Sequence, residues 1–125
     1  MIAYLAGELL ERHTDGVTLL AGDVGYRVIT TAPHGPLWIH AITSETGTRL
    51  YGFATQAERE AFTALLAVDG IGPKTAQAIV AAGVLHMAHL GERWFVKQTP
   101  QLSALTAVKG VGAKTAAKIL EALCA

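Results

Sequence analysis

The 125-residue chain has a single cysteine, few aromatic residues and no long hydrophobic run. A lone Cys124 excludes a disulfide framework, and a transmembrane helix is excluded because no apolar run reaches about 18 residues. The N-terminal segment MIAYLAGELLERH has no basic residue ahead of its apolar part and reaches Glu8 at once, which argues against a signal peptide. We therefore expect a cytoplasmic protein.

Charge is also scarce, at 16% of residues with a formal net charge of zero, whereas 51% of residues are hydrophobic. This composition excludes a disordered chain and suits one or two small globular domains. The zero average conceals an asymmetry. Residues 1–69 hold four basic and eight acidic residues, and residues 70–125 hold six basic and two acidic ones. The second half is thus expected to face a polyanion, with a chance distribution of surface charge as the alternative.

Up to residue 53 the sequence is typical of a small β-barrel. Short β-prone runs alternate with turn segments that contain Gly, Asp or Pro. An OB-type barrel accommodates five such strands because closure removes most exposed edges, and an SH3-like barrel fits the periodicity nearly as well. The predicted strands are Ile2–Leu10, Val17–Ala21, Tyr26–Thr31, Leu37–Thr43 and Thr48–Phe53.

After residue 54 the pattern becomes helical. Thr55 followed by Glu58 is a capping-box signature, and Thr99-Pro100 predicts a helix with Thr99 as N-cap and Pro100 as its first residue. We expect an α+β protein with an OB-like barrel over residues 1–54 and an all-α domain over residues 55–125. The predicted helices are one that places Phe62, Leu65 and Leu66 on one face, then Pro73–Ala82, Leu85–Lys97, Pro100–Ala107 and Ala113–Leu123.

The helical half contains an internal repeat. LAVDGIGPKTAQAI (Leu66–Ile79) recurs as TAVKGVGAKTAAKI (Thr106–Ile119), with identical residues at eight of 14 positions. Two copies of a Gly-x-Gly loop predict two copies of one local structure about a pseudo-twofold axis.

Glycine loops followed by Lys-Thr usually bind phosphate, and three kinds of loop compete here. A Walker loop needs Gly directly before Lys-Thr, where this chain has Pro73 and Ala113. A dinucleotide-binding loop needs Gly or Ala three residues after the second glycine, where this chain has Thr75 and Thr115. Both also require a preceding strand, but helical segments precede these loops. The two nucleotide-binding interpretations therefore fail.

The remaining interpretation is a helix–hairpin–helix motif. Its glycines permit positive φ and let a phosphate approach without a Cβ in the way. The free N–H groups at the start of the next helix, with the helix dipole, then bind an anionic oxygen. Lys74 and Lys114 lie where that dipole disfavours cations, so a bound phosphate would remove an unfavourable interaction. The alternative is that each Gly-x-Gly is only a turn between helices. Two copies with Lys-Thr at the same offset favour binding.

The flanking apolar residues should anchor each hairpin to its helices. Since hairpin amides contact phosphates and not base edges, binding should be independent of sequence, sensitive to salt and strengthened by oligomerisation. The expected anchors are Val68, Ile71, Ala76 and Ile79 for the first hairpin, and Val108, Val111, Ala116 and Ile119 for the second.

In order along the whole chain, these motifs resemble the RuvA family of Holliday-junction-binding subunits. The opening MIAYLAGELLER resembles the family's Met-Ile-x-x-Leu-x-Gly start, and GDVGYRV (Gly22–Val28) resembles its Gly-Val-Gly-Tyr-x-Val strand. LYGFATQAERE (Leu50–Glu60) resembles its Leu-Tyr-Gly-Phe segment and Glu-Arg helix, and the two repeats resemble its tandem hairpins. Each motif alone is weak, but together they are specific.

The resemblance implies a homotetramer, able to pair into an octamer, that holds a four-way DNA junction open for branch migration or resolution in recombination and repair. No cofactor is expected. The residues implied to contact DNA are Gly70, Ile71, Gly72, Lys74, Thr75, Gly110, Val111, Gly112, Lys114, Thr115 and Lys118.

The resemblance also implies an acidic pin, a hairpin before Leu-Tyr-Gly-Phe whose carboxylates repel the backbone at the junction centre. In the turn TSETGT only Glu45 is acidic, and Thr46 stands where the family often has a second carboxylate. A single carboxylate per chain would repel phosphate more weakly. An ordinary solvated turn residue is the alternative for Glu45.

The family continues into a third helical domain that docks the RuvB ATPase, whereas this sequence ends at Ala125, which weighs against docking of a RuvB-like ATPase. We expect no catalytic activity and no metal site, because the acidic residues are scattered. Metal-dependent junction cleavage and a scaffold that makes only protein contacts are the alternatives. His86 and His89 lack an evident third ligand, and Trp38 and Trp94 are expected in a core or interface.

Overall fold

The computed structural model describes residues 1–88 and 93–124. The chain divides into two compact units, Met1–Arg59 and Glu60–Ala125, and each is described by itself. Across the described residues no helix has the length and apolar character needed to cross a membrane.

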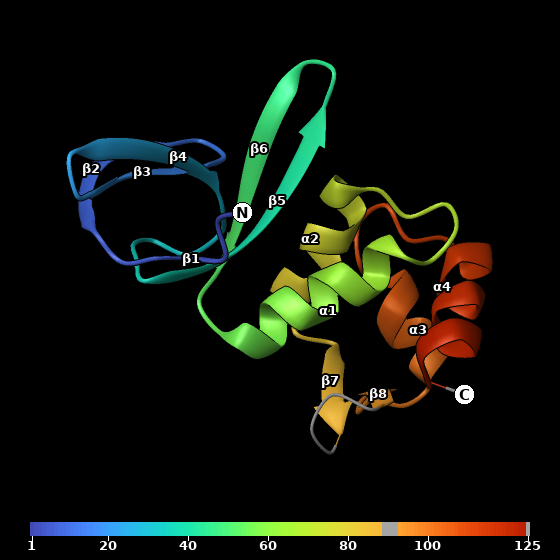
Figure 1. Cartoon of the computed structure of the whole chain (residues 1–125). Coiled ribbons are helices and arrows are strands. Elements are labelled where there is room, and N and C mark those ends of the chain that lie inside the picture. Colours follow the sequence, from blue (N-terminus) through green and yellow to red (C-terminus); the bar gives the residue numbers. More distant parts are fainter. Residues whose placement is uncertain (89–92, 125) are drawn as a thin grey trace. The chain divides into compact units, whose positions relative to one another are not determined.

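The first unit is a six-stranded sheet with the order β1-β5-β6-β4-β3-β2 (Figure 1). All neighbouring strands are antiparallel except β4 and β6, which are parallel. The strands are β1 (Tyr4–Leu5), β2 (Glu8–His13), β3 (Gly16–Ala21), β4 (Val24–Ile29), β5 (Leu37–Ser44) and β6 (Gly47–Phe53).

The N-terminal stretch closes the sheet into a barrel. The predicted strand Ile2–Leu10 is wrong in its continuity, because the chain breaks after Leu5 and continues as β2 from Glu8. β1 pairs with β5 and β2 pairs with β3, at opposite edges of the sheet. A Cβ on Gly7, in the break, would lie 2.2 Å from the carbonyl oxygen of Leu20, so only glycine fits this close approach. Counted as one bent strand, β1 and β2 complete the five-stranded barrel of the OB type, as predicted.

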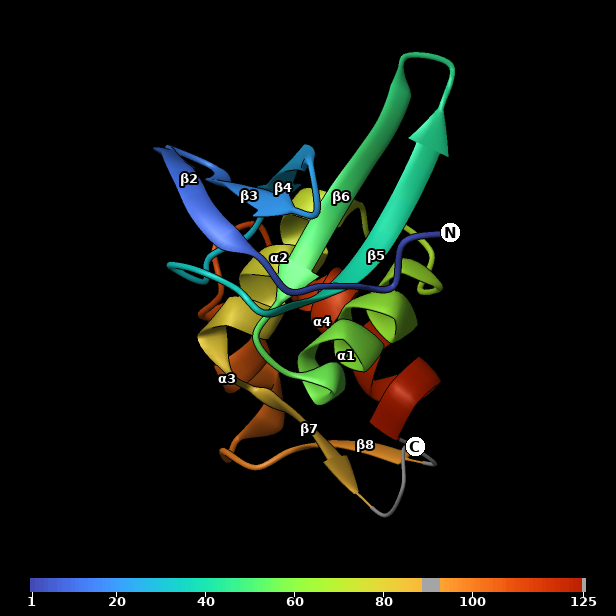
Figure 2. The ribbon, with the colours of Figure 1, turned by 60° about the vertical axis from the view of Figure 1, so that its left-hand side comes forward.

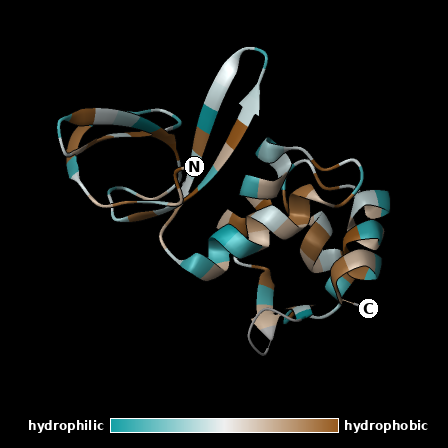
Figure 3. Cartoon of the chain, viewed as in Figure 1, coloured by the Kyte–Doolittle hydropathy of each residue, from teal (hydrophilic) through white to brown (hydrophobic). Residues whose placement is uncertain are grey.

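Alternation along the strands fills the barrel. Inward positions are apolar, whereas outward positions mix polar residues such as Thr18 and Arg27 with apolar ones such as Leu20. Figure 3 shows this mixture as brown, white and teal segments along the strands. Leu19, Val28 and Leu37 are fully buried. The core cluster comprises Leu5, Val17, Leu19, Val28, Leu37, Ile39 and Leu50.

The β5–β6 hairpin extends beyond the barrel as a two-stranded arm (Figures 1 and 2). β4 pairs with β6 only at Leu50 and Tyr51, whereas β5 and β6 stay paired as far as Ser44 and Gly47. Gly47 has φ +121°, which allows the tight turn at the end of the arm.

The second unit contains the two hairpins. Its elements are α1 (Gln56–Leu66, which begins in the first unit), α2 (Pro73–Ala82), β7 (Leu85–Ala88), β8 (Arg93–Val96), α3 (Gln101–Thr106), α4 (Ala113–Ile119) and a π-helical turn η1 (Leu120–Cys124). Thr55 is confirmed as the N-cap of α1, and its hydroxyl bonds both the backbone and the side chain of Glu58. The Thr55 hydroxyl accepts a hydrogen bond from the Glu58 N–H (3.2 Å) and donates one to the Glu58 carboxylate (2.9 Å).

The helix predicted over Leu85–Lys97 is wrong. Gly83, in the left-handed conformation at φ 68°, ends α2, and the next described segments are the antiparallel strands β7 and β8. Leu85, Trp94 and Val96 are buried on one face, while His86 and Phe95 lie on the other. This period of two is a strand pattern. The second unit is therefore not all-α, although the α+β class of the chain holds.

Two helix ends also differ from the prediction. Pro100 has ψ 138° and is the N-cap of α3, so the helix begins one residue later than predicted. The predicted helix Ala113–Leu123 is α-helical only to Ile119 and continues as η1. Neither difference affects the hairpin loops, which precede α2 and α4.

Candidate nucleic-acid interface

The two Gly-x-Gly loops have the same backbone geometry. We call residues 67–72 the first hairpin and residues 107–112 the second. The first glycine of each has positive φ, +86° at Gly70 and +90° at Gly110. The second glycine of each is extended, with φ −96° and ψ 176° at Gly72 and φ −89° and ψ 174° at Gly112. The repeat in sequence is therefore a repeat in structure.

Matching hydrogen bonds hold the two loops. Val68 and Val108 each accept a bond from the backbone N–H three residues on, at 3.2 Å from Ile71 and 3.1 Å from Val111. The carbonyl groups of the second glycines accept the first helical bonds of α2 and α4, at 3.0 Å and 2.9 Å respectively. The predicted anchors are confirmed, since all eight side chains are buried: Val68, Ile71, Ala76, Ile79, Val108, Val111, Ala116 and Ile119.

Each hairpin presents helix-starting amides to solvent. Gly72 and Gly112 are the N-caps of α2 and α4, and neither helix has a side-chain cap. No atom lies within 4 Å of where a Cβ would stand on either glycine. The first N–H groups of a helix have no partner within the helix, so an anionic oxygen could approach them here. Pro73 has no N–H, so the second hairpin offers one more donor, at Ala113.

The two hairpins meet each other's helices. A Cβ on Gly70 would lie 3.9 Å from Nζ of Lys118, which comes from α4. A Cβ on Gly110 would lie 3.6 Å from Oγ1 of Thr75, which comes from α2. The structure thus brings the residues of both loops into one cluster, an arrangement consistent with the predicted pseudo-twofold relation.

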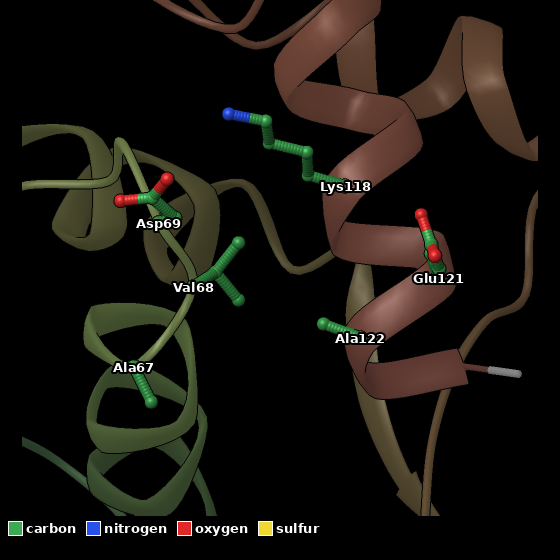
Figure 4. A pocket seen from close by; sticks show the side chains of 6 residues that line it. All are labelled: Ala67, Val68, Asp69, Lys118, Glu121 and Ala122. Carbon is green, nitrogen blue, oxygen red and sulfur yellow. The ribbon is translucent and has the colours of Figure 1, made fainter.

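The lysines near the hairpins differ in exposure. Lys74, Lys109 and Lys114 are exposed, and Lys118 is half-buried. Lys118 lines a cavity between the first hairpin and α4–η1, and its ammonium group points toward the hairpin side (Figure 4). The other residues lining the cavity are Ala67, Val68, Asp69, Glu121 and Ala122.

Glu45 belongs to the barrel unit and lies in the turn at the end of the β5–β6 arm. Its side chain is exposed. The turn is held by hydrogen bonds of the Ser44 hydroxyl with Thr46 Oγ1 (3.0 Å) and with the Gly47 carbonyl oxygen (3.4 Å). The structure therefore places Glu45, the residue predicted to form the pin, with an exposed side chain at the end of the projecting arm.

The histidines and tryptophans make packing contacts. The His86 ring lies 5.4 Å from the ring of Phe95, and His89 lies outside the described residues. Trp94 is buried, as expected of a core residue, and Trp38 packs edge-on to Tyr4 at 4.8 Å, under the guanidinium of Arg59. Within residues 1–88 and 93–124, no three His, Cys, Asp or Glu side chains gather as a metal site would require.

Sequence reasoning missed one charged depression on the barrel, lined by Asp15, Arg27, Ile29, Thr48, Arg49 and Leu50. A hydrogen bond from Arg27 to Asp15 (3.2 Å) holds the pKa of that carboxyl below its usual value. Arg27 and Arg49 lie on the neighbouring parallel strands β4 and β6. They are adjacent because the next residues along, Val28 and Leu50, pair with each other. Because β4 and β6 are separated by β5 in the sequence, no local sequence pattern predicts that these two arginines lie together.

These features define the class of the protein, an OB-type barrel joined to a tandem helix–hairpin–helix domain. Comparison with known families agrees in both parts. Residues 1–52 match the RuvA N-terminal domain, and residues 62–123 match the SAM-like tandem helix–hairpin–helix family. The chain belongs to the RuvA family.

Several curated relatives carry the name "Holliday junction branch migration complex subunit RuvA". The protein from Limosilactobacillus fermentum is 33% identical over 113 residues, which cover 80% of this chain and 56% of the relative. The protein from Alkalilimnicola ehrlichii is 37% identical over 91 residues (65% and 44%), and that from Halothermothrix orenii is 39% identical over 90 residues (66% and 46%). The chain spans about half the length of these relatives.

Proposed function

We propose that this chain binds four-way DNA junctions without regard to sequence and holds them open for branch migration or resolution in recombination and repair. The observation that carries the proposal is the pair of hairpins with one geometry, each with open, uncapped amides and a lysine in the first turn of its helix. The names of the relatives, all subunits of a junction branch migration complex, support the choice of DNA substrate.

The proposed DNA contacts are those predicted from the sequence. The amides of Gly72 and Lys74 at the first hairpin would bind a phosphate oxygen, and those of Gly112, Ala113 and Lys114 would bind one at the second. The ammonium groups of Lys74 and Lys114 would add charge. Thr75 and Thr115, next in the helices, are half-buried. Because none of these groups reads a base edge, affinity would come from the backbone alone.

Selectivity for a junction requires more than one copy of the chain. A pair of hairpins covers only a few phosphates, so one chain alone would bind weakly and without preference for shape. We propose that four chains place their hairpins on the four arms, with a second tetramer able to complete an octamer on DNA. Linked contacts of this kind raise affinity steeply when the geometry fits.

We propose that a separate protein, and not this chain, drives movement of the junction. The sequence has no nucleotide-binding loop, so ATP-driven migration would need a separate motor protein. Metal-dependent cleavage is not part of the proposal, because the described residues bring no set of metal ligands together.

The test is a competition between DNA shapes. A labelled immobile four-way junction, bound by the full chain, is challenged with unlabelled junction or with linear duplex of the same arm sequence. We expect the duplex to compete at least tenfold less well than the junction. Equal competition would contradict junction selectivity, and absence of binding would instead indicate that the hairpins make protein contacts.

For Glu45 we propose the role of the pin. A carboxylate at the end of the arm would repel phosphates where strands exchange, and so favour an open crossover. Since only one carboxylate is present per turn and Arg49 lies on the same hairpin, the repulsion would be weak and would depend on several copies meeting at one point.

Replacement of Glu45 with Gln is therefore expected to reduce opening while leaving affinity unchanged or slightly higher. The fluorescence of 2-aminopurine placed at the crossover reports unstacking, and junction titration reports affinity in the same samples. Glu11→Gln, an exposed change on β2, is the control. Unchanged fluorescence in the Glu45 variant, with binding intact, would contradict a pin.

A further inference from the structure

The two repeats distribute charge unequally along the sequence. At the position before the first glycine, the first hairpin has Asp69 and the second has Lys109. On the following helix, the second repeat has Lys118 where the first has Ala78. From sequence alone, the first repeat is neutral with Lys74 as its only cation, and the second carries three lysines. A phosphate would be expected to prefer the second hairpin strongly.

The fold changes this distribution. Lys118 belongs to the helix of the second hairpin, but its side chain extends across to the first, where Nζ lies 3.9 Å from the Cβ position of Gly70. It lines the cavity beside Ala67, Val68 and Asp69 (Figure 4). The residue is half-buried, as expected of a lysine whose apolar stem packs against the protein while its ammonium group stays in solvent.

The ammonium group remains available to a ligand. Lys118 forms an ion pair with neither Asp69 nor Glu121, although both of these described carboxylates line the same cavity. An ammonium group has three donors, and here they lie over the loop whose amides we assign to phosphate.

We propose that Lys118 contacts the phosphate held by the first hairpin and not the phosphate held by its own hairpin. This inference rests on the proposed function. Asp69 repels a phosphate at the first hairpin, and Lys118 opposes that repulsion from across the domain. The first hairpin then has Lys74 and Lys118 against Asp69, and the second has Lys109 and Lys114. Because Lys118 comes from the second repeat but serves the first hairpin, the net charges at the two phosphate sites become more nearly equal.

The experiment measures coupling between Lys118 and each hairpin. Lys118→Met keeps a long apolar stem and removes the charge. It is made alone, with Gly72→Ser and with Gly112→Ser, in the full chain. Each variant is titrated with the labelled four-way junction at several salt concentrations. Lys97→Met, an exposed change just after β8, is the charge-matched control, because Lys97 belongs to neither hairpin and does not line the cavity beside Lys118.

We expect Lys118→Met to weaken binding about tenfold alone and in the Gly112→Ser background, with the slope of log K against log salt lowered by about 0.9. In the Gly72→Ser background the loss should fall below twofold, because the first site is already blocked. Asp69→Lys should restore binding to Lys118→Met by placing a lysine where the second hairpin has Lys109. Lys97→Met should leave binding near that of the wild type.

The opposite coupling, with the loss abolished by Gly112→Ser and retained with Gly72→Ser, would assign Lys118 to the second hairpin and overturn the inference. If Lys118→Met lowered the affinity equally in the Gly72→Ser and Gly112→Ser backgrounds, the inference would also be overturned. The charge of Lys118 would then not act through either hairpin specifically. If the unaltered chain does not bind the junction, the proposed function itself fails, and that result is recognised before any variant is made.

Discussion

Replacement of both Gly72 and Gly112 with serine should lower the affinity for a four-way junction by about a hundredfold or more, without loss of folding stability. Each glycine has an extended backbone that any residue can adopt, and no atom stands where a Cβ would go. Serine is at least as good an N-cap as glycine. The folded state should therefore be as stable as the wild type or a few tenths of a kcal/mol more so.

The same capping hydroxyl that maintains the folding stability should lower the affinity for the junction. The serine hydroxyl accepts a hydrogen bond from the N–H groups that would otherwise hold phosphate, and its Cβ occupies the path of approach. A hydrogen bond to a charged group contributes about 1.5–3 kcal/mol. Loss of one at each of two hairpins amounts to about 3 kcal/mol or more, which is a factor of about a hundred in affinity.

The measurement pairs junction titration with thermal denaturation of the same variants. Gly25→Ser is the control, because a Cβ there would make only ordinary contacts, at 3.6 Å from Thr18 and 3.8 Å from Leu10, on the barrel. A double variant that is folded and binds the junction like the wild type would refute the role of the hairpin amides.

Replacement of Lys74 and Lys114 with methionine is the second change with a large expected effect. Both lysines are exposed and lie in the first turns of α2 and α4, where the helix dipole disfavours a cation. Their removal should stabilise the folded chain by about 0.3–1 kcal/mol per site at low salt. The same removal should weaken junction binding, because two phosphates lose their cations.

The salt dependence identifies this loss as electrostatic. The slope of log K against log salt should fall by about 0.9 for each phosphate contact removed, and the affinity for every arm sequence should drop equally. Lys97→Met again serves as the control. An unchanged slope in the double methionine variant would contradict phosphate contact by these lysines, whatever the change in affinity.

Most of the fold could be predicted because its signals are local. The capping box at Thr55, the proline at the start of α2 and the paired Gly-x-Gly loops each specify a backbone conformation within a few residues. The anchors of the hairpins could be predicted because apolar residues beside a solvent-exposed turn are buried by packing against the helices that the turn connects. The strands of the barrel followed from alternation and turn residues.

What could not be predicted depends on contacts between distant segments. The break at Gly7 becomes evident only once β1 and β2 are seen to pair with opposite edges of the sheet. The strands β7 and β8 were mistaken for a helix because LHMA and RWFV are short, and four residues hardly distinguish a period of two from one of 3.6. The position of Lys118 over the first hairpin depends on how α4 packs, which the repeat does not encode.

The central claim, that both hairpins hold DNA phosphates through their helix-starting amides, is tested most directly by amide NMR. The 15N-labelled chain is titrated with a four-way junction, and backbone amide shifts are followed residue by residue. We predict that the amides of Gly72, Lys74, Gly112 and Lys114 shift together, saturate at one stoichiometry and return at high salt, while those of His86 and Phe95 stay in place. Junction binding that leaves the hairpin amides unshifted would contradict the claim.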